Sequence, residues 1–173
     1  KILDKKNLLN NQKFQIKVSK KIPSEAGLGG GSMNAASVLK FLLKKKIINT
    51  SKKEIIEISQ LIGSDVILGL NQKSAILNSK NQIQFLKNIK KFYMLIVKPN
   101  FGCSTRDIYS KVKKFNKIKL NKPNKKMFDF EYLKKMNNDL EIIAFSKYPK
   151  LKKIKSYLET SLDPVFVRMT GSR

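Results

Sequence analysis

The spacing of apolar residues predicts a strand, a glycine-rich loop and a helix in the first quarter of the chain. Phe14, Ile16 and Val18 alternate with polar residues, a pattern typical of a half-buried strand. Between about residues 32 and 46 the apolar residues recur at helical spacing instead. The glycine-rich segment from Gly27 to Gly31 separates these two patterns.

A second helix is predicted by a capping box, in which Ser51 is followed three residues later by Glu54. Apolar residues then share one face of this helix, and Gly63 is expected to end it as the residue after the C-cap. Two short apolar runs follow, at residues 66–70 and 75–77, and we predict both as β-like segments.

The second half of the chain mixes strands and helices. A strand is predicted at residues 92–97, which Pro99 ends, and Ser104 or Thr105 is expected to cap a helix that runs through Tyr109 and beyond. A polar, basic stretch at 117–126 is interpreted as a solvated surface loop or linker. Further helices are predicted from residue 129, at 139–147 and at 150–158, and a last strand at 165–169. The elements do not alternate strictly as βαβ units, so the predicted class is α+β.

Composition favours a soluble domain. The chain has 173 residues, of which 41% are hydrophobic, and no apolar run approaches the roughly 20 residues that span a bilayer. Its start lacks the apolar core of a signal peptide, and its one cysteine, Cys103, fits a reducing compartment. We therefore expect a cytoplasmic location. Because the chain begins without methionine, we also expect it to be an internal piece of a longer protein.

The formal net charge of +25 raises the alternative of nucleic-acid binding. The basic residues are nearly all lysines, spread along the chain beside many asparagines and isoleucines, and only three are arginines. That composition is typical of an AT-rich genome, and sequence-specific base readout favours arginine. We therefore interpret the charge mainly as compositional drift. A positive field would still attract anionic substrates such as nucleotides.

The glycine-rich segment has the chemistry of a phosphate-binding loop. Glycines permit positive φ angles and close approach of a ligand, and the exposed N–H groups at the start of a helix bind phosphate. Ser32 adds a hydroxyl that could bond a phosphate or a magnesium-bound water. The segment is neither a Walker A motif nor G-x-G-x-x-G, so on its own it could equally be a plain turn from strand to helix.

The residues around the glycines resemble the phosphate-binding motif of the GHMP kinases (galacto-, homoserine, mevalonate and phosphomevalonate kinases). The triple glycine after Ala26-Gly27-Leu28 is most similar to the branch that acts on a cytidine diphosphate-linked methylerythritol. Four further landmarks follow in that branch's order. They are Gly63-Ser64-Asp65-Val66, Lys98-Pro99-Asn100-Phe101-Gly102-Cys103-Ser104-Thr105, Asn138-Asp139-Leu140-Glu141 and Met169-Thr170-Gly171-Ser172.

The resemblance implies a two-part fold, with a mixed sheet covered by helices on one face and a smaller C-terminal α/β part. The expected domains are residues 1–90, the remainder of an N-terminal ATP-binding domain, and 91–173, a truncated C-terminal domain. It also implies ATP and Mg²⁺ as cofactors. The expected ATP-binding residues are Pro23, Ala26, Gly27, Leu28, Gly29, Gly30, Gly31, Ser32 and Asn34.

The implied reaction transfers the γ-phosphoryl group of ATP to the 2-hydroxyl of the methylerythritol unit, in the non-mevalonate route to isoprenoid precursors. The chain has no histidine, so a base in this segment must be acidic. From the residues alone, Asp65 is better explained as a turn residue at a helix end. The resemblance instead makes Asp65 the catalytic residue, assisted by a lysine upstream of Lys1, and we expect residues 1–173 alone to be inactive.

The resemblance places Thr105 and Tyr109 in the substrate site, with the Tyr109 ring stacking on cytosine. A core position on a helix face explains Tyr109 equally well. Cys103 is interpreted as a small loop residue rather than a nucleophile. Asp139 and Glu141 are interpreted as helix-start residues, since acidic side chains suit that end of the helix dipole.

Three positions depart from the family pattern. Met33 replaces a second serine, Ile67-Leu68 replaces Pro-Phe, and Arg173 stands where glycine is usual. The alternatives left open are a homoserine or mevalonate type of kinase and, with less support, a basic nucleic-acid-binding domain. We expect small-molecule partners and no membrane association. The sequence leaves the oligomeric state, including a homodimer, open.

Overall fold

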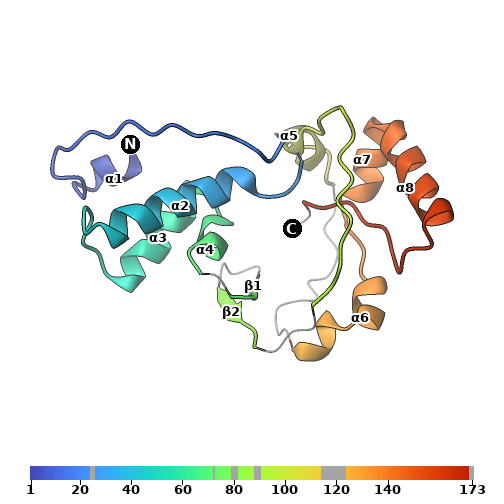
Figure 1. The fold of residues 1–173 in the computed structure, drawn as a ribbon. Coiled ribbons are helices and arrows are strands. Elements are labelled where there is room, and N and C mark those ends of the chain that lie inside the picture. Colours follow the sequence, from blue (N-terminus) through green and yellow to red (C-terminus); the bar gives the residue numbers. More distant parts are fainter. Residues whose placement is uncertain (24–25, 72, 79–81, 88–90, 114–123, 172–173) are drawn as a thin grey trace. The chain divides into compact units, whose positions relative to one another are not determined.

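Helices form most of the regular structure in the computed structural model (Figure 1). The structure describes residues 1–173 except 24–25, 72, 79–81, 88–90, 114–123 and 172–173. The chain divides into two units, the first made of residues 1–21 and 29–87 and the second of residues 22–28 and 88–173. The strands of the described residues form one antiparallel pair, and helices with a small sheet agree with the α+β class.

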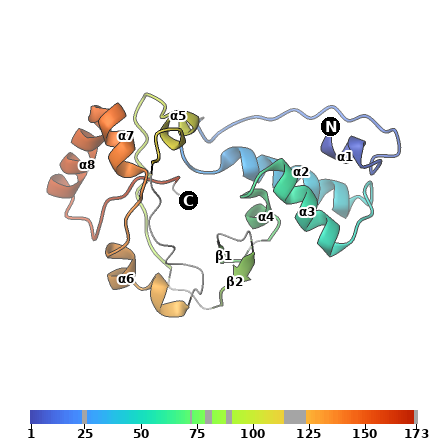
Figure 2. The same cartoon turned by 180° about the vertical axis from the view of Figure 1, so that it is seen from behind.

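The first unit is built around the helix that follows the glycines. Helix α2 buries Ala36, Leu39 and Leu42, and Figures 1 and 2 both show α3 lying along it. Ile58 of α3 and Val66 of α4 complete the buried cluster with Ile48. The elements of this unit are α1 (Ile2–Lys5), α2 (Gly30–Lys44), α3 (Lys52–Ile62), α4 (Val66–Gly69), β1 (Ala75–Leu77) and β2 (Ile83–Phe85).

The capping signals locate α3 correctly. Ser51 is its N-cap, and the Ser51 hydroxyl accepts a hydrogen bond from the Glu54 N–H at 3.1 Å. The other half of the capping box differs, because the Glu54 carboxylate accepts from the Thr50 hydroxyl instead. Gly63 does follow the helix, but its φ of 170° is extended backbone rather than left-handed.

The prediction of a β-like run at residues 66–70 is wrong. Residues 66–69 form the short helix α4, in which Val66 and Ile67 are both buried. A run of four apolar residues has no period that separates a buried strand from a buried helix turn. Packing decides here, because α4 lies against both α2 and α3. The run at 75–77 is the strand β1, as predicted, and pairs with β2 in the register Ile76 to Gln84.

The second unit has a smaller core at the start of its C-terminal helices. Ile108, Leu140 and Ala144 are buried together, with Tyr148 and Met169 packed against them. The predicted helices from 129, at 139–147 and at 150–158 are confirmed, with small shifts in their bounds. The elements are α5 (Thr105–Tyr109), η1 (Lys125–Phe128), α6 (Phe130–Lys134), α7 (Glu141–Lys147) and α8 (Pro149–Ser161).

Three predicted strands do not form: residues 14–18, 92–97 and 165–169 have no regular structure. Their apolar side chains are largely exposed, with Tyr93 fully so and Met94 at 82%. A strand exists only when a neighbouring strand accepts and donates its ladder hydrogen bonds, and alternation along one segment does not supply that neighbour. Residues 117–123 of the predicted linker lie outside the described residues.

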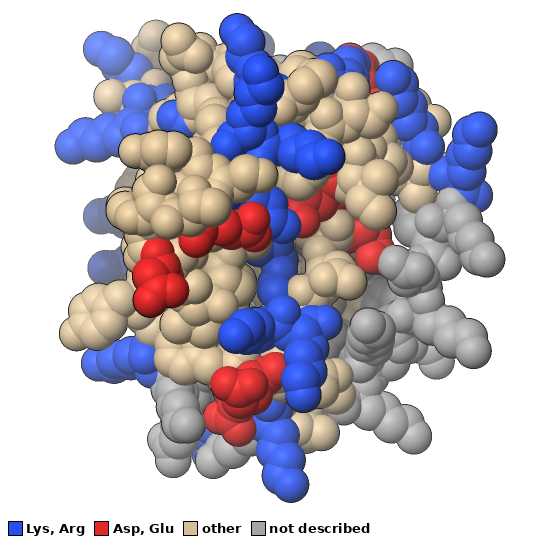
Figure 3. Space-filling model, turned by 90° about the vertical axis from the view of Figure 1, so that its right-hand side faces the viewer, with Lys and Arg blue, Asp and Glu red and all other residues tan. Residues whose placement is uncertain are grey.

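Charged side chains of both signs share the surface of the second unit that faces the viewer in Figure 3. Lysines project at many points, and aspartates and glutamates lie between them. Acidic side chains lie directly beside the basic ones on this face, so its charge is mixed. Among the helices of the described residues, none is long and apolar enough to cross a membrane.

Candidate functional site

The glycine loop enters α2 through left-handed backbone. Gly27 and Gly29 have φ angles of 67° and 65°, and Gly29 is the N-cap of the 15-residue helix. A Cβ atom at Gly29 or Gly31 would meet nothing within 4 Å, so the space beside this helix start is open. The first N–H groups of the helix carry the positive end of its dipole. The left-handed glycine turn and the helix start are therefore as predicted, and phosphate binding at this end of α2 stays a prediction.

The turn that carries Asp65 lies beside the start of α2. A Cβ atom built on Gly63 would be 3.9 Å from the Ser32 Oγ, so the backbone before Asp65 approaches this hydroxyl closely. Asp65 occupies the N-cap position of α4, yet its side chain makes no capping hydrogen bond. The Ser64 hydroxyl lies 3.5 Å from the Asp65 Oδ1. The first unit thus brings the loop hydroxyl of Ser32 beside the turn that carries Asp65, 33 positions further along the chain.

Met33 has a packing role that the sequence did not reveal. Its Cε and Sδ atoms would lie 3.0 Å from a Cβ on Gly69, and the Ala36 Cβ would lie 2.6 Å away. The side chain therefore points at α4. Gly69 allows α4 to approach α2 this closely, because it has no Cβ.

The beginning of the glycine loop contacts the Met169-Thr170-Gly171 segment within the second unit. The Thr170 Oγ1 lies 3.0 Å from the carbonyl oxygen of Gly27 and 3.3 Å from that of Ala26. A Cβ on Gly27 would be 2.7 Å from that same hydroxyl, and a Cβ on Gly171 would be 3.2 Å from the Gly27 Cα. Two glycine turns therefore pack backbone against backbone.

The other predicted ATP-binding residues flank Gly29 along the chain. Leu28 is half-buried and belongs to the second unit, and Pro23 is exposed. Gly30 and Asn34 lie in the first turns of α2, where Asn34 is half-buried. Their contacts with a nucleotide stay predictions.

The predicted substrate residues both lie on α5 in the second unit. Ser104 caps this helix, because its hydroxyl accepts from the Asp107 N–H at 3.4 Å. Tyr109 is half-buried and packs against the cluster of Ile108, Leu140 and Ala144. That packing agrees with the core interpretation of Tyr109, and its role in stacking on cytosine stays a prediction.

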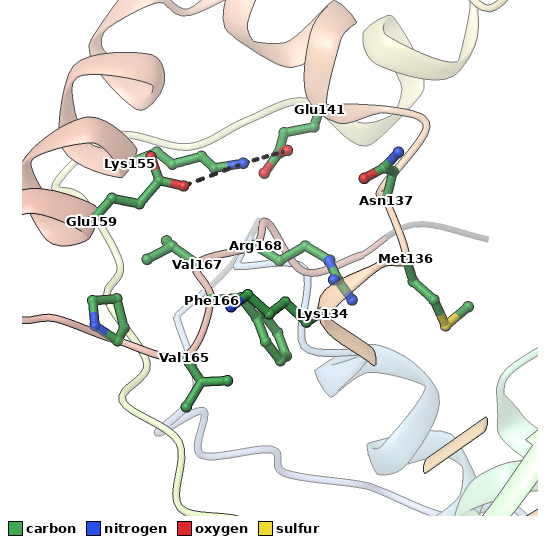
Figure 4. Close-up of a pocket in the computed structure, with 11 residues that line it drawn as sticks. Lys134, Met136, Asn137, Glu141, Lys155, Glu159, Val165, Phe166, Val167 and Arg168 are labelled. Carbon is green, nitrogen blue, oxygen red and sulfur yellow. Dashed lines mark hydrogen bonds and ion pairs between the residues drawn. The ribbon is translucent and has the colours of Figure 1, made fainter. Parts of the chain in front are cut away.

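A cavity of about 400 Å³ opens in the second unit, and its lining in the described residues contains none of the predicted site residues. Charged side chains line it, among them Glu141, Lys155, Glu159 and Arg168 (Figure 4). Lys155 bridges the two glutamates, with its Nζ 2.8 Å from the Glu141 Oε2 and 3.9 Å from the Glu159 Oε1. Burial lowers the pKa of Arg168 from its ordinary value.

Sequence reasoning missed the role of Glu141. Besides Lys155, its carboxylate accepts a hydrogen bond from the Met169 N–H at 3.0 Å. The prediction that it is a helix-start residue is correct, since α7 begins at Glu141, but incomplete. The available signal was that Asn138-Asp139-Leu140-Glu141 and Met169-Thr170-Gly171-Ser172 both occur among the family landmarks.

A second ion pair joins α5 to α7. The Lys147 ammonium lies against the Asp107 carboxylate, and this contact lowers the pKa of Asp107 and raises the pKa of Lys147. Among the residues that the structure describes, no three His, Cys, Asp or Glu side chains gather into a metal-binding group.

The family model and the similar proteins found by comparison agree with one another. Residues 1–78 match the GHMP kinases N terminal domain. A 4-diphosphocytidyl-2-C-methyl-D-erythritol kinase of Pelagibacter ubique is 56% identical over 172 residues, which cover 99% of this chain and 61% of that protein. Enzymes with the same name from Petrotoga mobilis and Clostridium botulinum are 36% and 35% identical, over 94% and 89% of this chain and 66% and 57% of their own lengths.

The chain thus spans between 57% and 66% of the length of these relatives. No solved structure matches it. The family model covers the helix start with its glycine loop and the turn with Asp65, which lie together in the first unit. The chain belongs to the GHMP kinase family.

Proposed function

We propose that the protein containing this chain is a 4-diphosphocytidyl-2-C-methyl-D-erythritol kinase. It transfers the γ-phosphoryl group of ATP to the 2-hydroxyl of that substrate, a step in the non-mevalonate route to isoprenoid precursors. The observation that carries the proposal is the 56% identity to the Pelagibacter enzyme across 99% of the chain. The proximity of the Ser32 hydroxyl to the turn with Asp65 supports it independently.

The glycine loop and the first turn of α2 hold the triphosphate in this proposal. Open space beside Gly29 and Gly31 lets phosphate oxygens reach the backbone N–H groups, and the helix dipole favours their charge. Phosphoryl transfer depends mainly on positioning and on neutralising charge. A site made largely of backbone N–H groups suits that demand.

Asp65 orients the acceptor hydroxyl and takes its proton. The hydroxyl oxygen forms the new bond to the γ-phosphorus as the bond to the β-phosphate oxygen breaks, which leaves ADP. The Asp65 side chain is half-buried at the start of α4. In this proposal the carboxylate acts as a general base.

Magnesium fits the donors that this site offers. The cation prefers oxygen ligands and usually binds through one or two carboxylates together with substrate phosphates. The Ser32 hydroxyl, at the start of α2, is an oxygen donor of this kind beside the loop. Bound with ATP, the ion would neutralise charge on the phosphates.

The finer expectations on architecture and substrate recognition belong to the same proposal. The N-terminal domain ends near residue 90 and the C-terminal domain begins near 91, which the division of the chain after Lys87 supports. Thr105 and Tyr109 then contribute to the cytidine site from α5.

The experiment follows ADP release by the complete gene product with Mg-ATP and one of three acceptors. These are 4-diphosphocytidyl-2-C-methyl-D-erythritol, homoserine and mevalonate. Turnover with the cytidine substrate alone is expected, because the relatives share that name. Turnover with homoserine or mevalonate in its place would contradict the proposal, as would failure with all three when ATP binds. Size-exclusion chromatography of the same preparation tests for a homodimer.

A further inference from the structure

We propose that Asn138 and Glu141 are positioning residues for the glycine loop, acting through the backbone of Met169 and the hydroxyl of Thr170. This inference rests on the proposed function, in which that loop binds ATP. Every contact in it lies within the second unit, which contains both residues 22–28 and residues 88–173.

The first step concerns Met169, whose backbone N–H and C=O groups both bond to side chains. We call Asn138 and Glu141, which make these two bonds, the clamp. Asn138 is 3% exposed, and its Nδ2 donates to the Met169 carbonyl oxygen at 2.7 Å. The Glu141 Oε1 accepts from the Met169 N–H at 3.0 Å. Both backbone polar groups of Met169 are therefore held by side chains three positions apart at the start of α7.

The clamp is itself held rigidly. The Asn138 Oδ1 accepts from the Leu140 N–H at 2.9 Å, which fixes the amide against the first turn of α7. The second oxygen of Glu141 accepts from Lys155 of α8, the contact drawn in Figure 4. The Met169 side chain packs on the buried cluster at the start of these helices. A buried hydrogen-bonding network with all its members satisfied fixes one geometry.

The second step links Met169 to the glycine loop through its neighbour Thr170. The next residue, Thr170, places its hydroxyl 3.0 Å from the Gly27 carbonyl oxygen. Gly27 has a φ of 67°, and Gly29, two residues on, is the left-handed N-cap of α2. A shift of Met169 would therefore change the support of the backbone that leads into the phosphate site. Displacements of about 1 Å at such a site can cost about a hundredfold in rate.

The place of Glu141 at the start of α7 does not by itself explain its contact with Met169. α7 begins at Glu141 with Leu140 at its N-cap, and Leu140 makes no side-chain capping bond. A helix-start glutamate gains from the dipole wherever its carboxylate points. Here the carboxylate reaches a residue 28 positions away. This hydrogen bond therefore fixes the position of Met169 relative to the start of α7, although the two are distant in sequence.

The test uses the complete gene product with Glu141→Ala, Asn138→Ala and Thr170→Val, each alone, and the double variant Glu141→Ala/Thr170→Val. Glu159→Gln is the matched control, because it also loses a carboxylate bonded to Lys155 but does not touch Met169. Two measurements are made: hydrogen exchange of the amides in residues 26–33 without ligand, and the KM for ATP against kcat.

We expect each single variant to speed exchange in residues 26–33 and to raise the KM for ATP about tenfold. The double variant should be no worse than the poorer single variant, because both changes break one chain of contacts. Glu159→Gln should match the wild type. Glu141→Gln keeps an oxygen acceptor for the Met169 N–H and should recover part of the loss, which also guards against misfolding of the alanine variant.

Lower thermal stability with unchanged exchange in residues 26–33 would overturn the proposal, since the clamp would then be merely structural. Additive effects of Glu141→Ala and Thr170→Val would also overturn it. The proposed function fails separately: if the wild type does not bind ATP, the exchange measurement still decides whether the clamp orders the loop.

Discussion

Gly69→Ala provides a sharp test of the packing between α4 and α2, because two effects oppose each other. Alanine in place of glycine inside a helix usually stabilises by about 0.5–1 kcal/mol. In α4, however, the new Cβ would lie 2.6 Å from the Ala36 Cβ and 3.0 Å from two atoms of Met33. Carbon atoms pack best at about 3.5–4.0 Å, so the contact with Ala36 is strongly repulsive.

The magnitudes favour destabilisation. Met33 is flexible and can move, but Ala36 is 0% exposed on α2 and can yield only if the helices separate. Adding one carbon to a packed core costs about 1–3 kcal/mol. After subtracting the gain in helix propensity, we expect Gly69→Ala to lower the free energy of unfolding by roughly 0.5–2 kcal/mol.

The assay is urea denaturation followed by circular dichroism, in which the midpoint should fall without a change in the slope m. Gly31→Ala is the matched control, because Gly31 is also in a helix but has nothing within 4 Å of its Cβ position. That variant should raise the midpoint. Gly69→Ala/Ala36→Gly moves the methyl group from one helix to the other and should recover part of the loss. A Gly69→Ala midpoint at or above the wild-type value would refute the reasoning.

Three further predictions concern the core, a cap and an ion pair. Leu39→Ala should cost about 2–5 kcal/mol by urea denaturation, since Leu39 is 1% exposed; a cost comparable with a surface substitution would contradict this. Ser51→Ala should cost about 1 kcal/mol through loss of the α3 cap, and an unchanged midpoint would show that the cap contributes nothing. Lys147 lowers the pKa of Asp107, so the pair should stabilise the fold above the ordinary pKa of 3.8 and lose this effect as the pH falls through the lowered value. A carboxyl titration by NMR of wild type and Lys147→Met checks this, and an Asp107 pKa unchanged by the substitution would contradict it.

Local signals in the sequence predicted the helices well. Ser51 and Glu54 located the start of α3, and the apolar spacing after the glycines located α2, which begins at Gly30 rather than Ser32 or Asn34. These signals depend on interactions between residues a few positions apart, so they do not require particular tertiary contacts with the rest of the chain. The glycine loop was predicted for the same reason, since positive φ and a helix start are both local properties.

Pairings over long distances could not be predicted. Residues 66–70 have the composition of a strand, and only contact with α2 and α3 makes residues 66–69 a helix. Likewise, the alternating residues 14–18 suit a strand but form none. The interaction between Glu141 and Met169 depends on how α7 meets the final segment, which no spacing in the sequence encodes.

The central claim is that Asp65 acts in phosphoryl transfer at a site formed by the glycine loop, and one measurement tests it most directly. The complete gene product and its Asp65→Asn variant are mixed with Mg-ATP and the cytidine substrate, and ADP formation in a single turnover is followed beside equilibrium binding of ATP. Glu57→Gln, an exposed position on α3, controls for the loss of one negative charge. We predict that Asp65→Asn slows transfer by about 10²–10⁴-fold and leaves ATP binding intact. Transfer at the wild-type rate in Asp65→Asn would contradict the account and make Asp65 a turn residue.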